Sequence, residues 1–328
     1  MSLIRLQIAT GVLLAGAACS HVVAQTAPPP PAATTGEQKT AVILVNFVDD
    51  ATQPITPAAA SNLVHGQVSD FFWENSYNKT FLSGDTFDWA TAPVTKAECR
   101  WTYIIDAGNK AMLAAGKNPA NYKHFVYLYP KATGCPTGGS NMIGPNGEMQ
   151  VFINGASGFT VPMIAHEMGH SFGLLHSDAL KCDKTPIGDA CSMINYGDPS
   201  DTMGTSGHFN AYWKERLGWL ATQGTPPLIN AAQSGRYVID RFETTGTRAK
   251  AVKVFKGIDP SNGRELWYYV EYRQAIGVDA VLANKPALAG VQVRKVSPSG
   301  SGGSSQFLDM TPNSATSGDF NDGALAVG

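Results

Sequence analysis

Three histidines and a glutamate within one short stretch have the spacing of the ligands and base of a catalytic metal site. The stretch contains His166, Glu167, His170, Gly173 and His176, which together spell H-E-x-x-H-x-x-G-x-x-H. Residues four apart on a helix lie on the same face, so His166 and His170 could offer two imidazoles to one ion. A glycine can adopt the positive φ that ends a helix, and at Gly173 this would turn the chain back and make His176 a third ligand.

Three neutral imidazoles that leave one position for water are the ligand set of a catalytic zinc site rather than of a closed structural one. Zinc lowers the pKa of its water to about 7 and polarises a carbonyl. Glu167, turned about 100° around the helix from His166, could take the proton of that water as a general base. The alternative is an ordinary amphipathic helix with surface histidines, because H-E-x-x-H alone also occurs by accident. The additional glycine and third histidine favour the metal site.

A methionine downstream lies in the tight sequence DTMG and is Met203. Metzincin peptidases place a methionine turn beneath the zinc as an apolar floor for the histidines. Met203 suits this role better than Met193, which is close to Cys191 and is not followed by a glycine. A single methionine otherwise indicates core filling, so this interpretation depends on its partnership with the histidine motif.

The segments HEMGHSFGLLHS, YGDPSDTMG and HFNAYWKERLGWL together resemble the gametolysin family of metzincins. FFWENSYNKTFLSGDTFDW and YKHFVYLYPKATGC resemble the same family, so the likeness covers about residues 40–222 well and continues more loosely to the end of the chain. It implies that the three histidines ligate zinc, that Glu167 is the base and that Met203 is the turn methionine. Ser177, directly after the third histidine, is also typical of matrixins, the nearest alternative family.

The resemblance implies an α+β metzincin catalytic domain over residues 41–222, with a mixed twisted sheet, an active-site helix and a methionine turn. Residue patterns predict its elements independently. The apolar runs AVILVNFV and HFVYLYP predict buried strands, TFLSGDTFDWA predicts another, and helices are expected over 57–73 and 106–115. By analogy with metzincins we also expect residues 150–154 to form an edge strand that pairs with an extended peptide. The alternative is an edge strand that binds nothing.

After Leu220 the character of the sequence changes. The short runs GRYVIDRF, AKAVKVFK, LWYYVEYR and GVQVRKV alternate between apolar and polar residues and are separated by Gly, Pro and Asn turns. They predict strands, and a small all-β, sandwich-like domain over residues 226–328 is the natural packing for them. We expect this domain to stabilise the catalytic domain. The chain ends within an apolar run, which leaves open whether the domain is truncated.

The beginning of the chain predicts export. Residues 1–24 resemble a secretory signal peptide, with Arg5 before an apolar stretch too short to span a bilayer and Ala24 at the cleavage position. Lipid anchoring at Cys19 is the alternative. Residues 25–40 are a Pro/Ala-rich linker. No other stretch is long and apolar enough for a transmembrane helix, so we expect a secreted or periplasmic protein.

Four cysteines remain after removal of the signal, and an even number in an oxidising compartment indicates two disulfide bonds. Four cysteines allow three pairings. We favour Cys182–Cys191, which would close a short loop after the histidine motif, together with Cys99–Cys135. A zinc site made of these cysteines is the alternative, and the sequence offers no C-x-x-C pair for it.

Charged residues make up 15% of the chain and the formal net charge is −2, so nothing predicts nucleic acid or anionic lipid as a partner. We therefore expect a monomeric, secreted zinc endopeptidase that acts on extracellular, cell-wall or matrix proteins. A zinc-binding but non-hydrolytic adhesin or matrix-binding protein is the alternative from another class, and hydrolysis of a non-peptide amide is a third. Calcium could bind Asp183, Asp189, Asp198 and Asp201, although these lack EF-hand spacing and turn formation explains them as well.

Overall fold

The chain folds into two compact units, which are described separately below. The structure is a computed structural model, and it describes residues 4–8, 34–144, 147–298, 303–314 and 320–326. One unit is Ala32–Leu174, and the other is Leu175–Gly328 together with the N-terminal segment. This division falls before the first strand that follows the histidine motif, and so earlier than the boundary near residue 222 that the sequence predicts.

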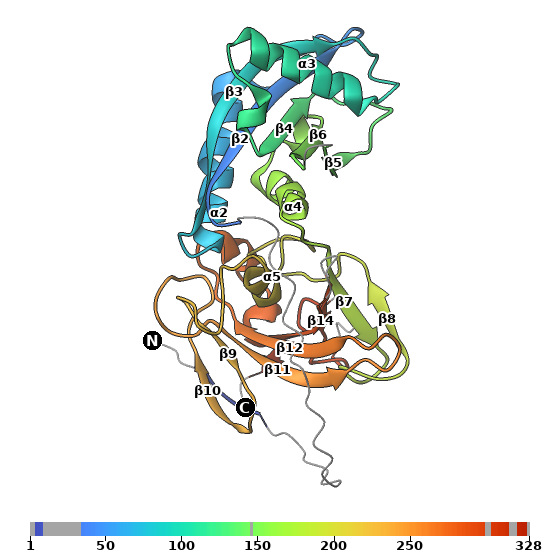
Figure 1. Ribbon diagram of the computed structural model, residues 1–328. Helices are drawn as coiled ribbons and strands as arrows, with labels where there is room; N and C mark the ends of the chain where they lie inside the picture. Colours follow the sequence, from blue (N-terminus) through green and yellow to red (C-terminus); the bar gives the residue numbers. More distant parts are fainter. Residues whose placement is uncertain (1–3, 9–33, 145–146, 299–302, 315–319, 327–328) are drawn as a thin grey trace. The chain divides into compact units, whose positions relative to one another are not determined.

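The unit Ala32–Leu174 is built on a mixed five-stranded sheet (Figure 1). The pairs β3–β2, β2–β4 and β4–β6 are parallel, and β5 runs antiparallel to β6. In spatial order the strands are β3 (Thr80–Ala92), β2 (Gly36–Phe47), β4 (His124–Tyr129), β6 (Met149–Asn154) and β5 (Gly138–Ile143). The three strands that the apolar runs predict are present as β2, β3 and β4.

Helices cover both faces of this sheet. Helix α3 (Trp101–Ala114) packs on one face, where its Ile104 and Met112 join Ile43 and Tyr127 in a buried cluster. Helix α4 (Val161–Ser171) packs against β5 and β6 on the other face. Successive strand residues point to opposite faces of a sheet, so each face has its own set of residues to bury. The helical run before β3 also contacts α4. This run consists of α1 (Pro57–Ser61), the π-helix η1 (Asn62–Val68) and α2 (Ser69–Asn75). The short 3-10 helices η2 (Pro119–Asn121) and η3 (Ala156–Gly158) complete the unit.

The prediction that residues 150–154 form an edge strand is wrong. Strand β6 pairs with β4 on one side and with β5 on the other, so it lies inside the sheet. The edge is β5, whose sequence GGSNMI is only partly buried along its length. Two glycines and small polar residues give β5 no alternating pattern, and glycine and asparagine are uncommon in strands, so the sequence did not reveal it.

The unit Leu175–Gly328 contains an eight-stranded sheet in the order β8-β7-β14-β13-β12-β11-β9, with β15 also paired to β13. Strand β14 pairs in parallel with β7 and so joins the later strands to those after the histidine motif, whereas the expected all-β, sandwich-like domain over residues 226–328 stays a prediction. A period-two pattern identifies a strand but not its partner. The bounds are β7 (Ser177–Cys182), β8 (Cys191–Ile194), β9 (Leu228–Asn230), β11 (Ala251–Ile258), β12 (Glu265–Tyr272), β13 (Gly290–Ser297), β14 (Ser304–Leu308) and β15 (Leu325–Ala326).

A separate two-stranded sheet pairs β1 (Ile4–Ile8) with β10 (Gly235–Ile239). Strand β1 is the described part of the predicted signal peptide, whereas Cys19, Ala24 and the linker up to residue 33 lie outside the described residues. Among the described residues no helix has the length and apolar character needed to cross a membrane. The helical elements of this unit are α5 (Ala211–Arg216), η4 (Gly277–Leu282) and η5 (Pro286–Leu288).

Two disulfide bonds are present. Cys99 and Cys135 connect the segment before α3 to the loop after β4, and Cys182 and Cys191 join directly opposed positions of β7 and β8. These are the pairings that the sequence favours. Because all four sulfurs are used in this way, these cysteines do not provide thiolates for a metal site.

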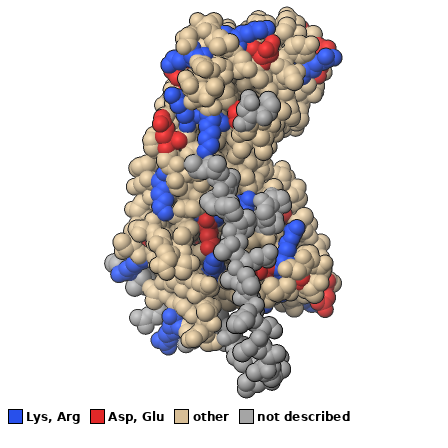
Figure 2. Space-filling model, in the orientation of Figure 1, with Lys and Arg blue, Asp and Glu red and all other residues tan. Residues whose placement is uncertain are grey.

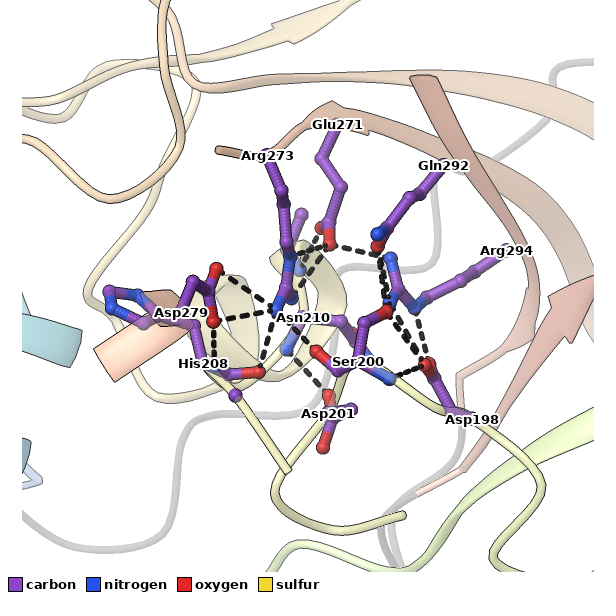
Figure 3. Close-up of polar contacts among 12 residues, drawn as sticks. Asp198, Ser200, Asp201, His208, Asn210, Glu271, Arg273, Asp279, Gln292 and Arg294 are labelled. Atoms are coloured by element: carbon purple, nitrogen blue, oxygen red, sulfur yellow. Dashed lines mark hydrogen bonds and ion pairs between the residues drawn. The ribbon is translucent and has the colours of Figure 1, made fainter. Parts of the chain in front are cut away.

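A buried network of charged side chains holds the loop between β8 and α5 (Figure 3). Arg294 of β13 donates from Nε and Nη2 to the two carboxylate oxygens of Asp198 in this loop, at 2.6 and 3.2 Å. Its Nη1 donates to Glu271 of β12 at 2.5 Å. The other Glu271 oxygen accepts the backbone N–H of Ala211, the first residue of α5, at 2.7 Å. Arg294, Asp198 and Glu271 are all 0% exposed.

Arg273, the residue directly after β12, extends the network to the far end of the same loop. It donates to the backbone carbonyls of Ser200 and His208, and it pairs with Asp279 at 3.4 Å. Asp279 in turn accepts the backbone N–H of His208 at 2.7 Å. Burial, together with the charges of Lys214 and Arg273, holds the pKa of His208 well below its ordinary value. The loop is therefore held at both ends by buried charged side chains.

Replacement of Arg294 by methionine tests the contribution of this network. The substitution would leave the buried Asp198 carboxylate without its cation, while Glu271 would keep its pair with Arg273. Loss of one partner of a buried ion pair costs about 3–5 kcal/mol of unfolding free energy. Urea denaturation of Arg294→Met and of the matched control Arg264→Met, an exposed arginine of the same unit, measures the difference. We expect the control to change stability by no more than about 0.5 kcal/mol. An equal effect of the two substitutions would contradict the account.

Candidate metal centre

Helix α4 carries the first two histidines of the motif. Its start is fixed by Thr160, whose hydroxyl accepts the backbone N–H of Met163 at 3.4 Å, and by a proline in the first turn. His166 and His170 follow one turn apart, with ring centroids 4.8 Å from each other. Both side chains are half-buried, so they remain accessible to an ion while the helix packs on the sheet.

The end of α4 brings the third histidine back toward the other two. Gly173 has a φ of 82°, its N–H donates to the carbonyl of His170 at 2.8 Å, and the N–H of Leu174 donates to the carbonyl of Gly169 at 3.0 Å. This pair of bonds is a Schellman motif, which requires the left-handed conformation that glycine adopts readily. The ligand nitrogens of the three histidines lie within 4.8 Å of one another.

The tautomer of His170 suits metal binding. Its Nδ1 lies 2.9 Å from the backbone carbonyl oxygen of Leu174. A carbonyl oxygen can only accept a hydrogen bond, so Nδ1 carries the proton and Nε2 keeps its lone pair. Metal-ligating histidines commonly have such a partner on the other ring nitrogen, which fixes the ring orientation.

The turn that contains Met203 is hydrogen-bonded to the residue after the third histidine. The backbone N–H of Ser177 donates to the carbonyl of Met203 at 2.9 Å. Asp201 accepts the N–H of Met203 and that of Asn210, each at 2.6 Å, and Asn210 donates from its side chain to Ser177 Oγ at 3.3 Å. Met203 is fully buried, whereas Met193 is 56% exposed. Sequence reasoning did not identify the part that Asp201 and Asn210 play in this arrangement.

Glu167 is buried beside the edge strand β5. It is 6% exposed, and burial raises its pKa to about 7 by disfavouring the charged carboxylate. A Cβ added to Gly139 of β5 would lie only 2.3 Å from Glu167 Oε1. A residue larger than glycine at position 139 would therefore require the Glu167 side chain to move, and sequence reasoning missed this contact. A cation nearby would favour the ionised form.

The aspartates considered for calcium have different environments. Asp198 and Asp201 are buried and already bind Arg294 or backbone N–H groups. Asp183 and Asp189 lie exposed in the loop that Cys182–Cys191 closes. Within the described part of the chain, the three histidines are the one group of at least three His, Cys, Asp or Glu side chains that converges as metal ligands would. Calcium binding at Asp183 and Asp189 stays a prediction.

Comparison with known proteins gives one family. The profile of the family described as Gametolysin peptidase M11 matches residues 55–296, which is more than half of the chain. The matched region begins just before α1 and ends in β13, so it includes the three histidines, Glu167 and Met203. A search of curated proteins finds no match.

The contact between Gly139 and Glu167 can be tested by a double-mutant cycle. Gly139→Ala should destabilise the protein, because the new methyl group overlaps the Glu167 side chain, and overpacking costs about 1–3 kcal/mol. In a Glu167→Ala background the overlapping atoms are absent, so most of this cost should disappear. Unfolding free energies of the four proteins give the coupling, which for residues in contact is about 0.5–3 kcal/mol. The same cost of Gly139→Ala in both backgrounds would contradict the packing described here.

Proposed function

The chain belongs to the gametolysin M11 family of metallopeptidases, and from this premise we propose that it is a zinc-dependent endopeptidase. The observation that carries the proposal is the convergence of His166, His170 and His176, whose ligand nitrogens lie within 4.8 Å of one another. Membership in the family implies a hydrolase that uses a metal. The identity of the metal, the roles of individual residues and the substrate are our proposals.

The donor atoms fit zinc. Three neutral imidazole nitrogens are the protein ligands of one class of catalytic zinc site. All three rings are half-buried and their ligand nitrogens lie close together, so His166, His170 and His176 would hold the ion. The hydrogen bond of His170 Nδ1 supports coordination through Nε2. We propose that Met203, buried and bonded to Ser177, provides the apolar floor under the histidines.

Glu167 is the proposed general base. When bound, zinc polarises the substrate carbonyl and acidifies the attacking water. Glu167 takes a proton from that water and transfers it to the nitrogen of the leaving amine, so that the carboxyl group is restored for the next cycle. Its place directly after His166 on α4 and its burial beside β5 support this role.

We propose that the substrate backbone pairs with the free edge of β5 (Gly138–Ile143). An extended peptide can add to an exposed sheet edge through backbone hydrogen bonds, and β5 has a sheet neighbour, β6, on one side. Strand β5 contacts helix α4, and Gly139 lies against Glu167. A peptide on this edge would therefore run close to the proposed base. This assignment replaces residues 150–154, which lie inside the sheet.

We infer that the enzyme acts outside the cytoplasm. Two disulfide bonds support this inference, since such bonds persist in oxidising compartments. The predicted signal peptide and the domain limits, 41–222 and 226–328, remain part of the proposal. Positive and negative side chains are scattered over the face seen in Figure 2, in agreement with the net charge of −2. Proteins or peptides are the proposed substrates.

Replacement of the proposed base tests the mechanism. Glu167→Gln keeps the size of the side chain but removes proton transfer, so hydrolysis of casein should fall by about 10²–10⁴-fold. Zinc content should stay near one ion per chain. Glu98→Gln, a change at an exposed acid of the same unit, is the control and should retain activity. Full activity of Glu167→Gln in a protein that binds zinc would exclude this mechanism.

A further inference from the structure

Tyr196 lies over the third histidine of the motif. The ring centroids of Tyr196 and His176 are 3.8 Å apart, and the ring planes are tilted by 35°. At this separation the two rings are in van der Waals contact. Tyr196 thus covers one face of the imidazole, although its own side chain is 41% exposed. A metal uses the in-plane lone pair of an imidazole, so contact with the ring face does not compete with coordination.

The backbone of Tyr196 has an uncommon conformation. Its φ is 57°, in the left-handed region that bulky side chains rarely adopt. Residues held in such a conformation cost about 1–3 kcal/mol and persist where the surrounding structure determines them. They occur often at functional sites. The backbone of Tyr196 is therefore held in this conformation by its surroundings and not by a local preference.

Contacts on both sides of Tyr196 attach it to the strand that begins after His176. The N–H of Tyr196 donates to Asp178 Oδ1 of β7 at 3.1 Å. The N–H of Asp198 donates to the carbonyl of Ser177 at 3.2 Å, and the Asp198 side chain is held by Arg294 (Figure 3). The ring that covers His176 and the backbone that carries His176 are thus parts of one rigid arrangement.

We propose that Tyr196 is a positioning residue for His176. Its ring limits rotation of the imidazole, so the ligand nitrogen stays directed toward the ion before the ion arrives. The proposal rests on the zinc site of the proposed function. It assigns to Tyr196 no contact with the reacting atoms, and the contribution comes from the aromatic ring and not from the hydroxyl group.

Three substitutions in the full-length protein separate these features. Tyr196→Phe keeps the ring and removes the hydroxyl. Tyr196→Gly and Tyr196→Asn remove the ring, and both residues tolerate the left-handed backbone. Zinc affinity is measured by competition with a chromogenic chelator. Loss of a group that orients a metal ligand weakens affinity about 10–100-fold. We expect this loss for the glycine and asparagine variants, and a change of no more than about twofold for phenylalanine.

Asn284→Gly is the matched control. Asn284 lies in the same unit, has a φ of 65° and is exposed, so the change introduces a left-handed glycine away from the histidines. Its zinc affinity should equal that of the wild type. Thermal unfolding of the zinc-free variants checks that each one folds. At saturating zinc, hydrolysis by the glycine variant should recover most of the wild-type kcat.

Two results would overturn the proposal while leaving the proposed function intact. One is a glycine variant that binds zinc as tightly as the wild type. The other is a phenylalanine variant that loses kcat at saturating zinc, since the hydroxyl would then act on the substrate. A wild-type protein that binds no zinc would instead overturn the proposed function, and this inference with it.

Discussion

The convergence of the three imidazoles depends on how helix α4 ends. Two of the histidines, four residues apart, come from the helix itself, but a straight helix would carry His176 away from them. The left-handed Gly173 and the two hydrogen bonds of the Schellman motif reverse the chain within three residues. A residue with a Cβ would adopt this conformation only at a cost. The rest of the site follows from this reversal.

The histidines before the chain reversal and the histidine after it are supported by different parts of the chain. His166 and His170 are fixed by α4, which packs on β5 and β6. His176 is fixed by what surrounds the start of β7, namely the Tyr196 ring, the turn at Met203 and the loop that buried charges hold. Buried ion pairs add little net stability on average. Their value here is to specify the position of a loop that has little regular secondary structure.

The sequence predicted the parts of the site that have a fixed local spacing. The histidines, Glu167 and Gly173 lie within eleven residues of one another, so helix geometry and the glycine turn place them. The residue patterns also correctly located β2, β3 and β4. It failed where position depends on distant residues. Strand β5 has no β pattern in its sequence GGSNMI, and its Gly139 lies against Glu167, a residue of a later element. The pairing of β14 with β7, the role of Asp201 and the contact of Tyr196 with His176 all join segments that local patterns do not relate.

X-ray absorption spectroscopy at the zinc edge tests the central claim most directly, because it reports the atoms around the ion. For the protein loaded with one zinc ion per chain, three imidazole nitrogens should appear at about 2.0–2.1 Å together with one light ligand from solvent. The multiple scattering that imidazole rings produce should fit three rings. A spectrum with sulfur at about 2.3 Å, or one that fits fewer than three imidazoles, would contradict the account.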